Sequence, residues 1–228
     1  MAEPPRDYHH YVIRDGRLVG EFEAMYRHSD AVPWHQDQQD EWIDVRLTTE
    51  MLREFRPFDE IHDCGCGLGY YLRLMRDRLG TTDCVAFGYD ISPTACEQAG
   101  RLFPGFNFRT LNLSQPPTQP ADGTGRSQGG PRRLFIIRGT LWYVFPAIAN
   151  VVAGLRNLMS AGDLLLVVQN FPPLKAPSVG KEIFPDHHAV IDRFQSNFVP
   201  VRHLWYQDTL KTANDNWFIG LFRPRQSE

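Results

Sequence analysis

The stretch HDCGCGLG at residues 62–69 decides the fold. Its three glycines follow a short strand-like segment, 60–64, and precede an amphipathic segment, 70–79, so a strand, a turn and a helix come in that order. Glycine permits positive φ and lets a ligand lie against the backbone, and the start of a helix leaves N–H groups unpaired. The stretch therefore predicts a turn that holds a nucleotide-like ligand.

The spacing of this turn separates the candidate ligands. The dinucleotide pattern G-x-G-x-x-G, counted from Gly65, needs a third glycine where Tyr70 stands, and no lysine follows the turn as a phosphate loop requires. Asp63 precedes the turn, where a carboxylate would repel a pyrophosphate but suit an ammonium group. Asp90 follows the next expected strand, where acids accept hydrogen bonds from ribose hydroxyls. A ligand with an amine and a ribose but no phosphate is S-adenosylmethionine (SAM); the alternative is that both aspartates are only turn or cap residues.

The rest of the chain alternates strand-like and helical segments. Strands are expected at 60–64, 84–89, 106–111, 134–138 and 164–169, and helices at 70–79, 92–103, 147–160 and 187–198. Such alternation implies a parallel sheet. Residues 201–224 indicate an antiparallel hairpin around Asn214-Asp215-Asn216. We therefore expect an α/β protein: a Rossmann-like, seven-stranded, mostly parallel sheet with a terminal antiparallel hairpin, helices on both faces and an N-terminal helical lid.

The segments outside this alternation are the N-terminus and two long connections. Residues 1–20 are expected to form an extended arm with two short strands around Asp15-Gly16, and 21–56 has helical periodicity that stops at a proline. The proline-rich segments 116–132 and 170–186 are expected to be loops.

Four longer stretches together resemble the class I SAM-dependent methyltransferases of the small-molecule type. They are HDCGCGLG at 62–69, AFGYDISPTACEQA at 86–99, RLFIIRGTLWYV at 133–144 and LMSAGDLLLVVQ at 158–169. In LNLS at 111–114, Asn112 departs from the acid that this family usually has beside the adenine, and YRHSDAVPWHQ at 26–36 is similar to lid segments in which a tryptophan approaches the cofactor.

The resemblance, which covers roughly 58–170, implies a division into an N-terminal arm and lid, 1–57, and a SAM-binding domain, 58–228. It also implies a set of residues that contact the cofactor. These are Trp34, Asp63, Gly65, Cys66, Gly67, Asp90, Ile91, Asn112, Leu113 and Arg138.

Methyl transfer to a hydroxyl gains about 10²–10⁴-fold from a general base, whereas a neutral amine needs none. Histidine suits this role near neutral pH. His35 in the expected lid and the pair His187 and His188 after the second long loop are the candidates, with surface or capping roles as the alternative. Tyr143 is a candidate for orienting the acceptor, with core packing as its alternative.

Composition excludes several other classes. The net charge of −3 and the pI near 6.2 argue against a nucleic-acid partner, as does the missing N-P-P-[YF] signature. No apolar run approaches the ~20 residues of a membrane span. The N-terminus is unlike a signal peptide and the four cysteines suit free thiols, so we expect a cytoplasmic protein without a metal site.

The sequence thus predicts a SAM-dependent methyltransferase acting on a hydroxyl or amine of a small molecule. A sugar is slightly favoured over another secondary metabolite, because GTLWYVFP at 139–146 and QNFPP at 169–173 resemble methyltransferases of bacterial carbohydrate-modifying pathways. An NAD(P)-dependent oxidoreductase and a non-catalytic SAM-binding partner protein are the alternatives. Trp205 and Trp217, expected to be exposed, make a homodimer conceivable.

Overall fold

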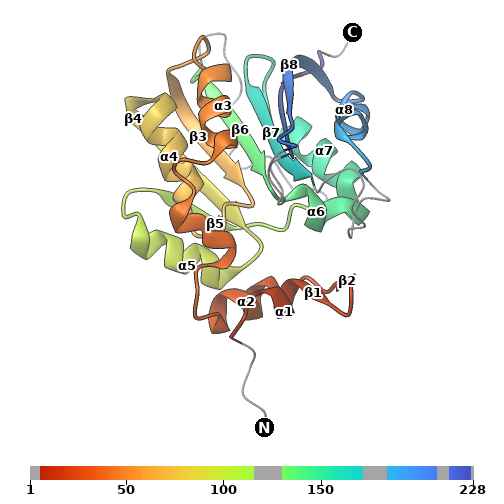
Figure 1. The fold of residues 1–228 in the computed structure, drawn as a ribbon. Helices are drawn as coiled ribbons and strands as arrows, with labels where there is room; N and C mark the ends of the chain where they lie inside the picture. Colours follow the sequence, from red (N-terminus) through yellow and green to blue (C-terminus); the bar gives the residue numbers. More distant parts are fainter. Residues whose placement is uncertain (1–5, 116–129, 172–183, 210–215, 227–228) are drawn as a thin grey trace.

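The computed structural model describes residues 6–115, 130–171, 184–209 and 216–226. Within them, seven strands form one mixed sheet in the order β5-β4-β3-β6-β7-β9-β8 (Figure 1). These strands are β3 (Phe58–Cys64), β4 (Gly80–Asp90), β5 (Asn107–Thr110), β6 (Arg133–Arg138), β7 (Leu164–Phe171), β8 (Phe198–Tyr206) and β9 (Asn216–Pro224). The five strands from β5 to β7 are parallel, and β9 runs antiparallel to both β7 and β8. The predicted mostly parallel sheet with a terminal antiparallel hairpin is confirmed.

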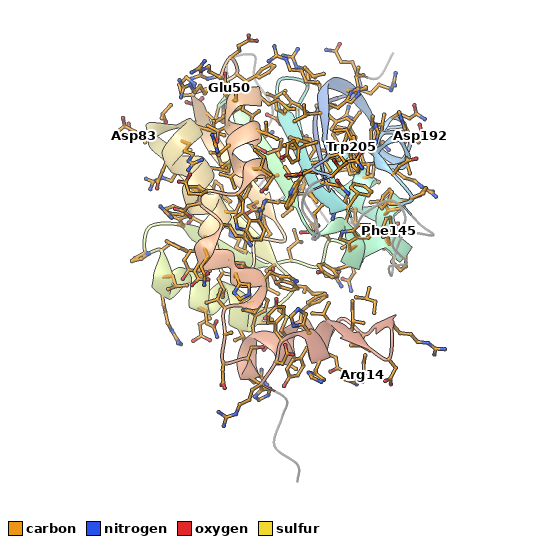
Figure 2. The ribbon with its side chains drawn as sticks, viewed as in Figure 1. Arg14, Glu50, Asp83, Phe145, Asp192 and Trp205 are labelled. Atoms are coloured by element: carbon orange, nitrogen blue, oxygen red, sulfur yellow. The ribbon has the colours of Figure 1, made fainter. Side chains whose placement is uncertain are left out.

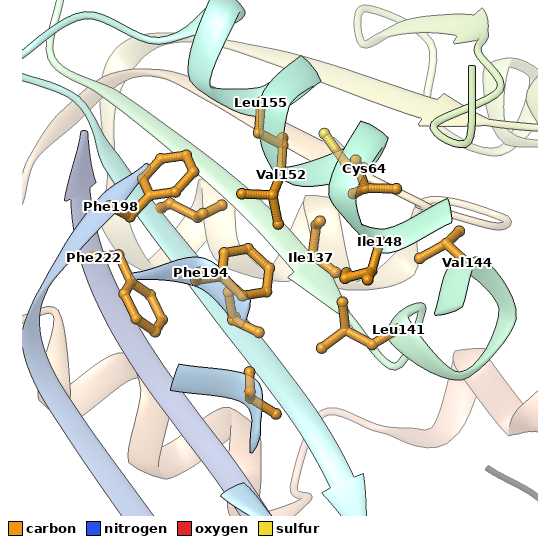
Figure 3. Close-up of a cluster of buried hydrophobic side chains, with 14 of the residues drawn as sticks. Cys64, Ile137, Leu141, Val144, Ile148, Val152, Leu155, Phe194, Phe198 and Phe222 are labelled. Atoms are coloured by element: carbon orange, nitrogen blue, oxygen red, sulfur yellow. The ribbon is translucent and has the colours of Figure 1, made fainter. Parts of the chain in front are cut away.

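Helices cover both faces of the sheet, as expected. On one face lie α3 (Ile43–Met51) and α4 (Tyr70–Leu79), and on the other lie α6 (Leu141–Val144), α7 (Ile148–Leu158) and α8 (His187–Phe194). Alternate residues of β6 supply the two cores, because successive side chains of a strand point to opposite faces. Ile136 joins the α3–α4 side and Ile137 the α7–α8 side, where Figure 3 shows it in one cluster with Val152 and Leu155. The remaining helix, α5 (Pro93–Leu102), packs against β4 and β5.

The N-terminal segment lies across the end of the sheet at which the parallel strands finish (Figure 1). Its elements are α1 (His9–Val12), β1 (Ile13–Arg14), β2 (Arg17–Leu18), α2 (Phe22–His28) and a 3₁₀ helix (Pro33–Gln38). The hairpin at Asp15-Gly16 is confirmed, but the arm is not wholly extended. Tyr11 and Val12 of α1 are buried against α2, and this burial stabilises a helical turn that the expected arm lacks.

We call residues 8–39 the cap, because α3 occupies a different place from the segment before it. Figure 2 shows Arg14 in the cap and Glu50 near the end of α3 at opposite ends of the molecule. Val45 of α3 is fully buried in the same core as α4. The part of the segment 21–56 before α3 therefore lies over the strand ends, and the start of α3 joins it there through Ile43 and Arg46.

The other expected elements differ from the structure mainly at their ends. Helix α8 stops at Phe194 rather than 198, because Phe198 pairs with Pro224 as the first residue of β8. Most of the two expected loops, and the hairpin tip at Asn214-Asp215, lie outside the described residues. All four cysteines are free and buried, and no helix in the described ranges is long and apolar enough to cross a bilayer.

Candidate active site

A cavity of about 890 Å³ lies between the cap and the carboxyl ends of the parallel strands. Its size is typical of a small-molecule site, for which volumes of about 300–1,000 Å³ are usual. Most of the residues predicted for cofactor and catalysis line it. They are Trp34, His35, Asp63, Gly65, Cys66, Asp90, Ile91, Asn112, Leu113, Arg138 and Tyr143.

The glycine turn has the conformation that its sequence requires. Gly65, Gly67 and Gly69 have φ values of 92°, 53° and 82°, a region that L side chains rarely adopt. A Cβ added to Gly67 would lie 2.5 Å from Nε2 of Gln36, a residue of the cap. Gly67 therefore faces the cap closely and contributes its backbone, rather than a share of the cavity wall.

Asp90 joins the ends of β3 and β4. Its Oδ2 accepts a hydrogen bond from Gly67 N at 2.9 Å, and its Oδ1 accepts one from Ser92 N at 2.9 Å. Burial raises the pKa of Asp90, although these two hydrogen bonds oppose the shift. The N-cap residue of α5 is Ser92, whose Oγ accepts a hydrogen bond from Ala95 N. Asp90 is therefore a turn residue that also lines the cavity.

Asp63 is the cavity acid whose ionised form a cationic ligand would stabilise most. Its side chain is 2% exposed and lines the cavity, and no hydrogen bond to its carboxylate is made by the described residues. Burial raises its pKa to about 7, despite the opposing charge of Arg138. A ligand ammonium at this place would supply the counter-charge that the protein leaves out.

Arg138 holds the start of α3 and the cap against the end of β6. Its Nε donates to Asp44 Oδ2 at 2.7 Å and its Nη1 to Gln39 Oε1 at 2.5 Å. Its guanidinium lies 4.5 Å from the centre of the Tyr71 ring, while Nη2 and the second oxygen of Asp44 are buried and unpaired. Asp44 and Gln39 were not predicted, because their burial becomes evident only in the structure.

The cap makes two further contacts that the sequence did not predict. Gln36 Oε1 accepts from Leu68 N at 2.9 Å, inside the glycine turn. Glu23 accepts from Thr94 N at 3.1 Å and from the hydroxyls of Ser92 and Thr94 at 2.5 and 2.6 Å. Burial alone would raise the pKa of Glu23, but these hydrogen bonds lower it to about 2.

The base candidates fall into two groups. His35 is exposed and lines the cavity, whereas His187 and His188 begin α8 but do not line it. His187 instead stacks on Trp205, with ring centres 4.8 Å apart, on the α8 side of the hairpin. The expectation that this pair faces the cleft is therefore wrong: the apolar side of α8 packs onto β8 and β9 and carries His187 with it.

The aromatic and thiol groups of the cavity stay protonated at neutral pH. Burial raises the pKa of Tyr143 to about 12, and the centre of its ring lies 5.8 Å from that of Trp34. Burial also raises the pKa of the Cys66 thiol well above its usual value.

Trp217 is buried, contrary to expectation, because it packs beside Trp42 over Arg138. Among the described residues, no three His, Cys, Asp or Glu side chains are grouped so as to hold a metal ion.

No protein-family model and no curated protein matches the sequence. Solved structures do match. The N-methyltransferase NodS from Bradyrhizobium japonicum WM9, in complex with S-adenosyl-L-homocysteine (SAH), superimposes with a TM-score of 0.59 at 12% identity, over 86% of this chain and 94% of that one. A geranyl diphosphate methyltransferase bound to its substrate and sinefungin gives 0.52 at 14% identity, over 78% and 77%. A TehB-like SAM-dependent methyltransferase from Corynebacterium glutamicum gives 0.54 at 12% identity, over 78% and 87%. At these identities the likeness establishes the fold.

Proposed function

We propose that this chain, whose fold is that of the class I SAM-dependent methyltransferases, binds SAM in its cavity and transfers the methyl group to a small molecule. The observation that carries the proposal is Asp63, a buried carboxylate with no donor among the described residues, next to a glycine turn with positive φ. SAM has an ammonium group for such a carboxylate and a ribose for Asp90.

The turn itself favours SAM over a dinucleotide. In a dinucleotide site the free N–H groups at the start of the helix bind the pyrophosphate. Here Gly67 N–H donates to Asp90 and Leu68 N–H donates to Gln36, so neither is free for a phosphate. The acid at Asp63 would add repulsion. These features speak against the oxidoreductase alternative.

The sheet order divides the cavity into two halves. The cofactor half lies at the ends of β3, β4 and β5, with Asp63, Asp90 and Asn112. The acceptor half lies beyond β3, at the ends of β6 and β7 and the start of the antiparallel β9, where Asn170 and Trp217 line the wall. An acceptor in this second half would meet the methyl group where the two halves join.

The protein's part in the transfer is to orient the methyl donor and the acceptor and to exclude water. SAM supplies an activated methyl group on a sulfonium. Holding donor and acceptor in line accounts for much of the acceleration, since effective molarities reach ~10⁵ M or more. His35, one of two histidines that line the cavity with His9, is our candidate to take a proton from an acceptor hydroxyl, and the Tyr143 hydroxyl, protonated at neutral pH, can donate a hydrogen bond that orients the acceptor.

Acceptor and setting are part of the same proposal. A sugar or another secondary metabolite with a hydroxyl or amine suits a cavity with aromatic walls and several polar groups, and NodS and the geranyl diphosphate enzyme are named for small-molecule or N-methyl chemistry. We propose a cytoplasmic enzyme without a nucleic-acid or membrane partner. A homodimer remains part of the proposal, but neither tryptophan supports it as expected, because Trp217 is buried and Trp205 is half-buried against Phe171 and His187.

Calorimetry with SAM, SAH and NADH tests the cofactor. We expect SAM and SAH to bind and NADH not to, and Gly67→Val to abolish binding, because its side chain would collide with Gln36 and Tyr26. A matched Gly100→Val at a glycine with open space around it should bind SAM normally. NADH binding without SAM binding would overturn the proposal.

A further inference from the structure

The cap is attached to the two turns that carry the cofactor acids. Gln36 contacts the turn after β3 through Leu68 N–H, and Glu23 contacts the turn after β4 through Ser92 and Thr94. These turns follow Asp63 and Asp90 directly along the chain. Any movement of the cap must therefore break contacts with the cofactor-binding backbone.

Both polar atoms of the Gln36 amide make hydrogen bonds that hold it at the glycine turn. Its Oε1 lies 2.9 Å from Leu68 N, and its Nε2 donates to the Tyr26 hydroxyl at 3.3 Å. Leu68 is 5% exposed, so loss of Gln36 would leave its N–H as a buried donor without a partner.

The backbone that presents Gln36 is strained. Trp34 and His35 have φ values of 54° and 50°, which non-glycine residues adopt only under constraint. The constraint comes from Gln39, whose Nε2 donates to Trp34 O at 2.8 Å, and from the packing of the Trp34 ring between Phe22 and Tyr143. Gln36 follows the strained pair directly, so the strain is carried by the segment that reaches the glycine turn.

We propose that Gln36 is a positioning residue that latches the cap onto the glycine turn and so slows release of the cofactor product. This inference rests on the proposed function. The latch joins Gln36 to Leu68 N–H, which lies between Gly67 and Gly69, both of positive φ. Release of the latch detaches the cap from the glycine turn, next to the cavity wall formed by Tyr8, Phe22 and Trp34.

Release of SAH measured by stopped-flow tryptophan fluorescence tests the latch. We expect Gln36→Met to raise the dissociation rate constant about tenfold and to change the association rate constant less than threefold. Gln38→Met is the matched control, since Gln38 is an exposed glutamine of the same 3₁₀ helix, and it should leave both constants unchanged. Tyr26→Phe removes the hydroxyl that orients the amide and should give an intermediate increase.

Hydrogen exchange distinguishes a latch from a merely structural role. In Gln36→Met, SAH should no longer protect residues 22–38 but should still protect 88–92. Equal dissociation from the Gln36 and Gln38 variants, or equal loss of protection in both segments, would overturn the latch alone. If Gln36→Met does not fold, Tyr26→Phe with an unaltered dissociation rate would overturn it as well. Failure of the unaltered chain to bind SAH would instead refute the proposed function, and the latch with it.

Discussion

The pH dependence of SAM binding follows from Asp63. Burial raises the pKa of this carboxyl to about 7 in the cofactor-free protein. Below pH 7 the group is mainly protonated and neutral, and a cationic ligand must first displace the proton. Above pH 7 it is mainly ionised and ready to pair with the ligand ammonium. SAM affinity should therefore rise with pH across neutrality.

The magnitude comes from the ionised fraction. With a pKa near 7 that fraction is roughly one eleventh at pH 6 and ten elevenths at pH 8, so affinity should differ by about tenfold, or ~1.4 kcal/mol. Calorimetry at pH 6 in two buffers of different ionisation enthalpy should also show release of close to one proton per SAM bound.

Two variants assign the effect. Asp63→Asn cannot ionise, so it should bind SAM weakly and with no slope between pH 6 and 8. His35→Gln and His9→Gln should both keep the slope, which separates Asp63 from the two histidines that line the same cavity. An affinity that is flat with pH in the unaltered chain, or a slope that survives in Asp63→Asn, would refute the reasoning.

Further predictions concern the other cavity residues. Asp90→Ala removes a buried acceptor and should weaken SAM by roughly 10- to 150-fold, corresponding to ~1.5–3 kcal/mol, in a titration; an unchanged affinity would leave Asp90 with its turn role only. His35→Ala should lower kcat for a hydroxyl acceptor by about 10²-fold with little change in SAM affinity, and the loss should shrink at high pH; a loss under threefold indicates an amine acceptor. Glu23→Ala removes the acceptor for Ser92 and Thr94, so hydrogen exchange of α2 should speed up in the cofactor-free protein, while exchange in α7 stays constant.

The sheet and the glycine turn could be predicted because local sequence determines them. The helix 70–79 was predicted with its observed ends, since Gly69 and Gly80 bracket an amphipathic run. The positions of Asp63 and Asp90 at one cavity followed from the rule that parallel strands end at the same edge of a sheet.

The contacts that close the site could not be predicted, because they join residues far apart in the chain. Gln36 and Leu68 are 32 positions apart, and Arg138 and Asp44 are 94 apart. Nothing in the local pattern of either partner indicates such a pair. The prediction that His187 faces the cleft was wrong for a related reason. Which side of α8 faces the sheet depends on the position of β8 and β9, whose Trp205 and Phe218 contact the His187 ring.

Methyl transfer from isotope-labelled SAM to a cell extract tests the central claim most directly. We expect labelled product in the small-molecule fraction with the unaltered chain, none with Gly67→Val, and normal labelling with Gly100→Val. An unaltered chain that binds SAM but labels nothing in that fraction would contradict the account, and would favour a non-catalytic SAM-binding protein or a macromolecular acceptor.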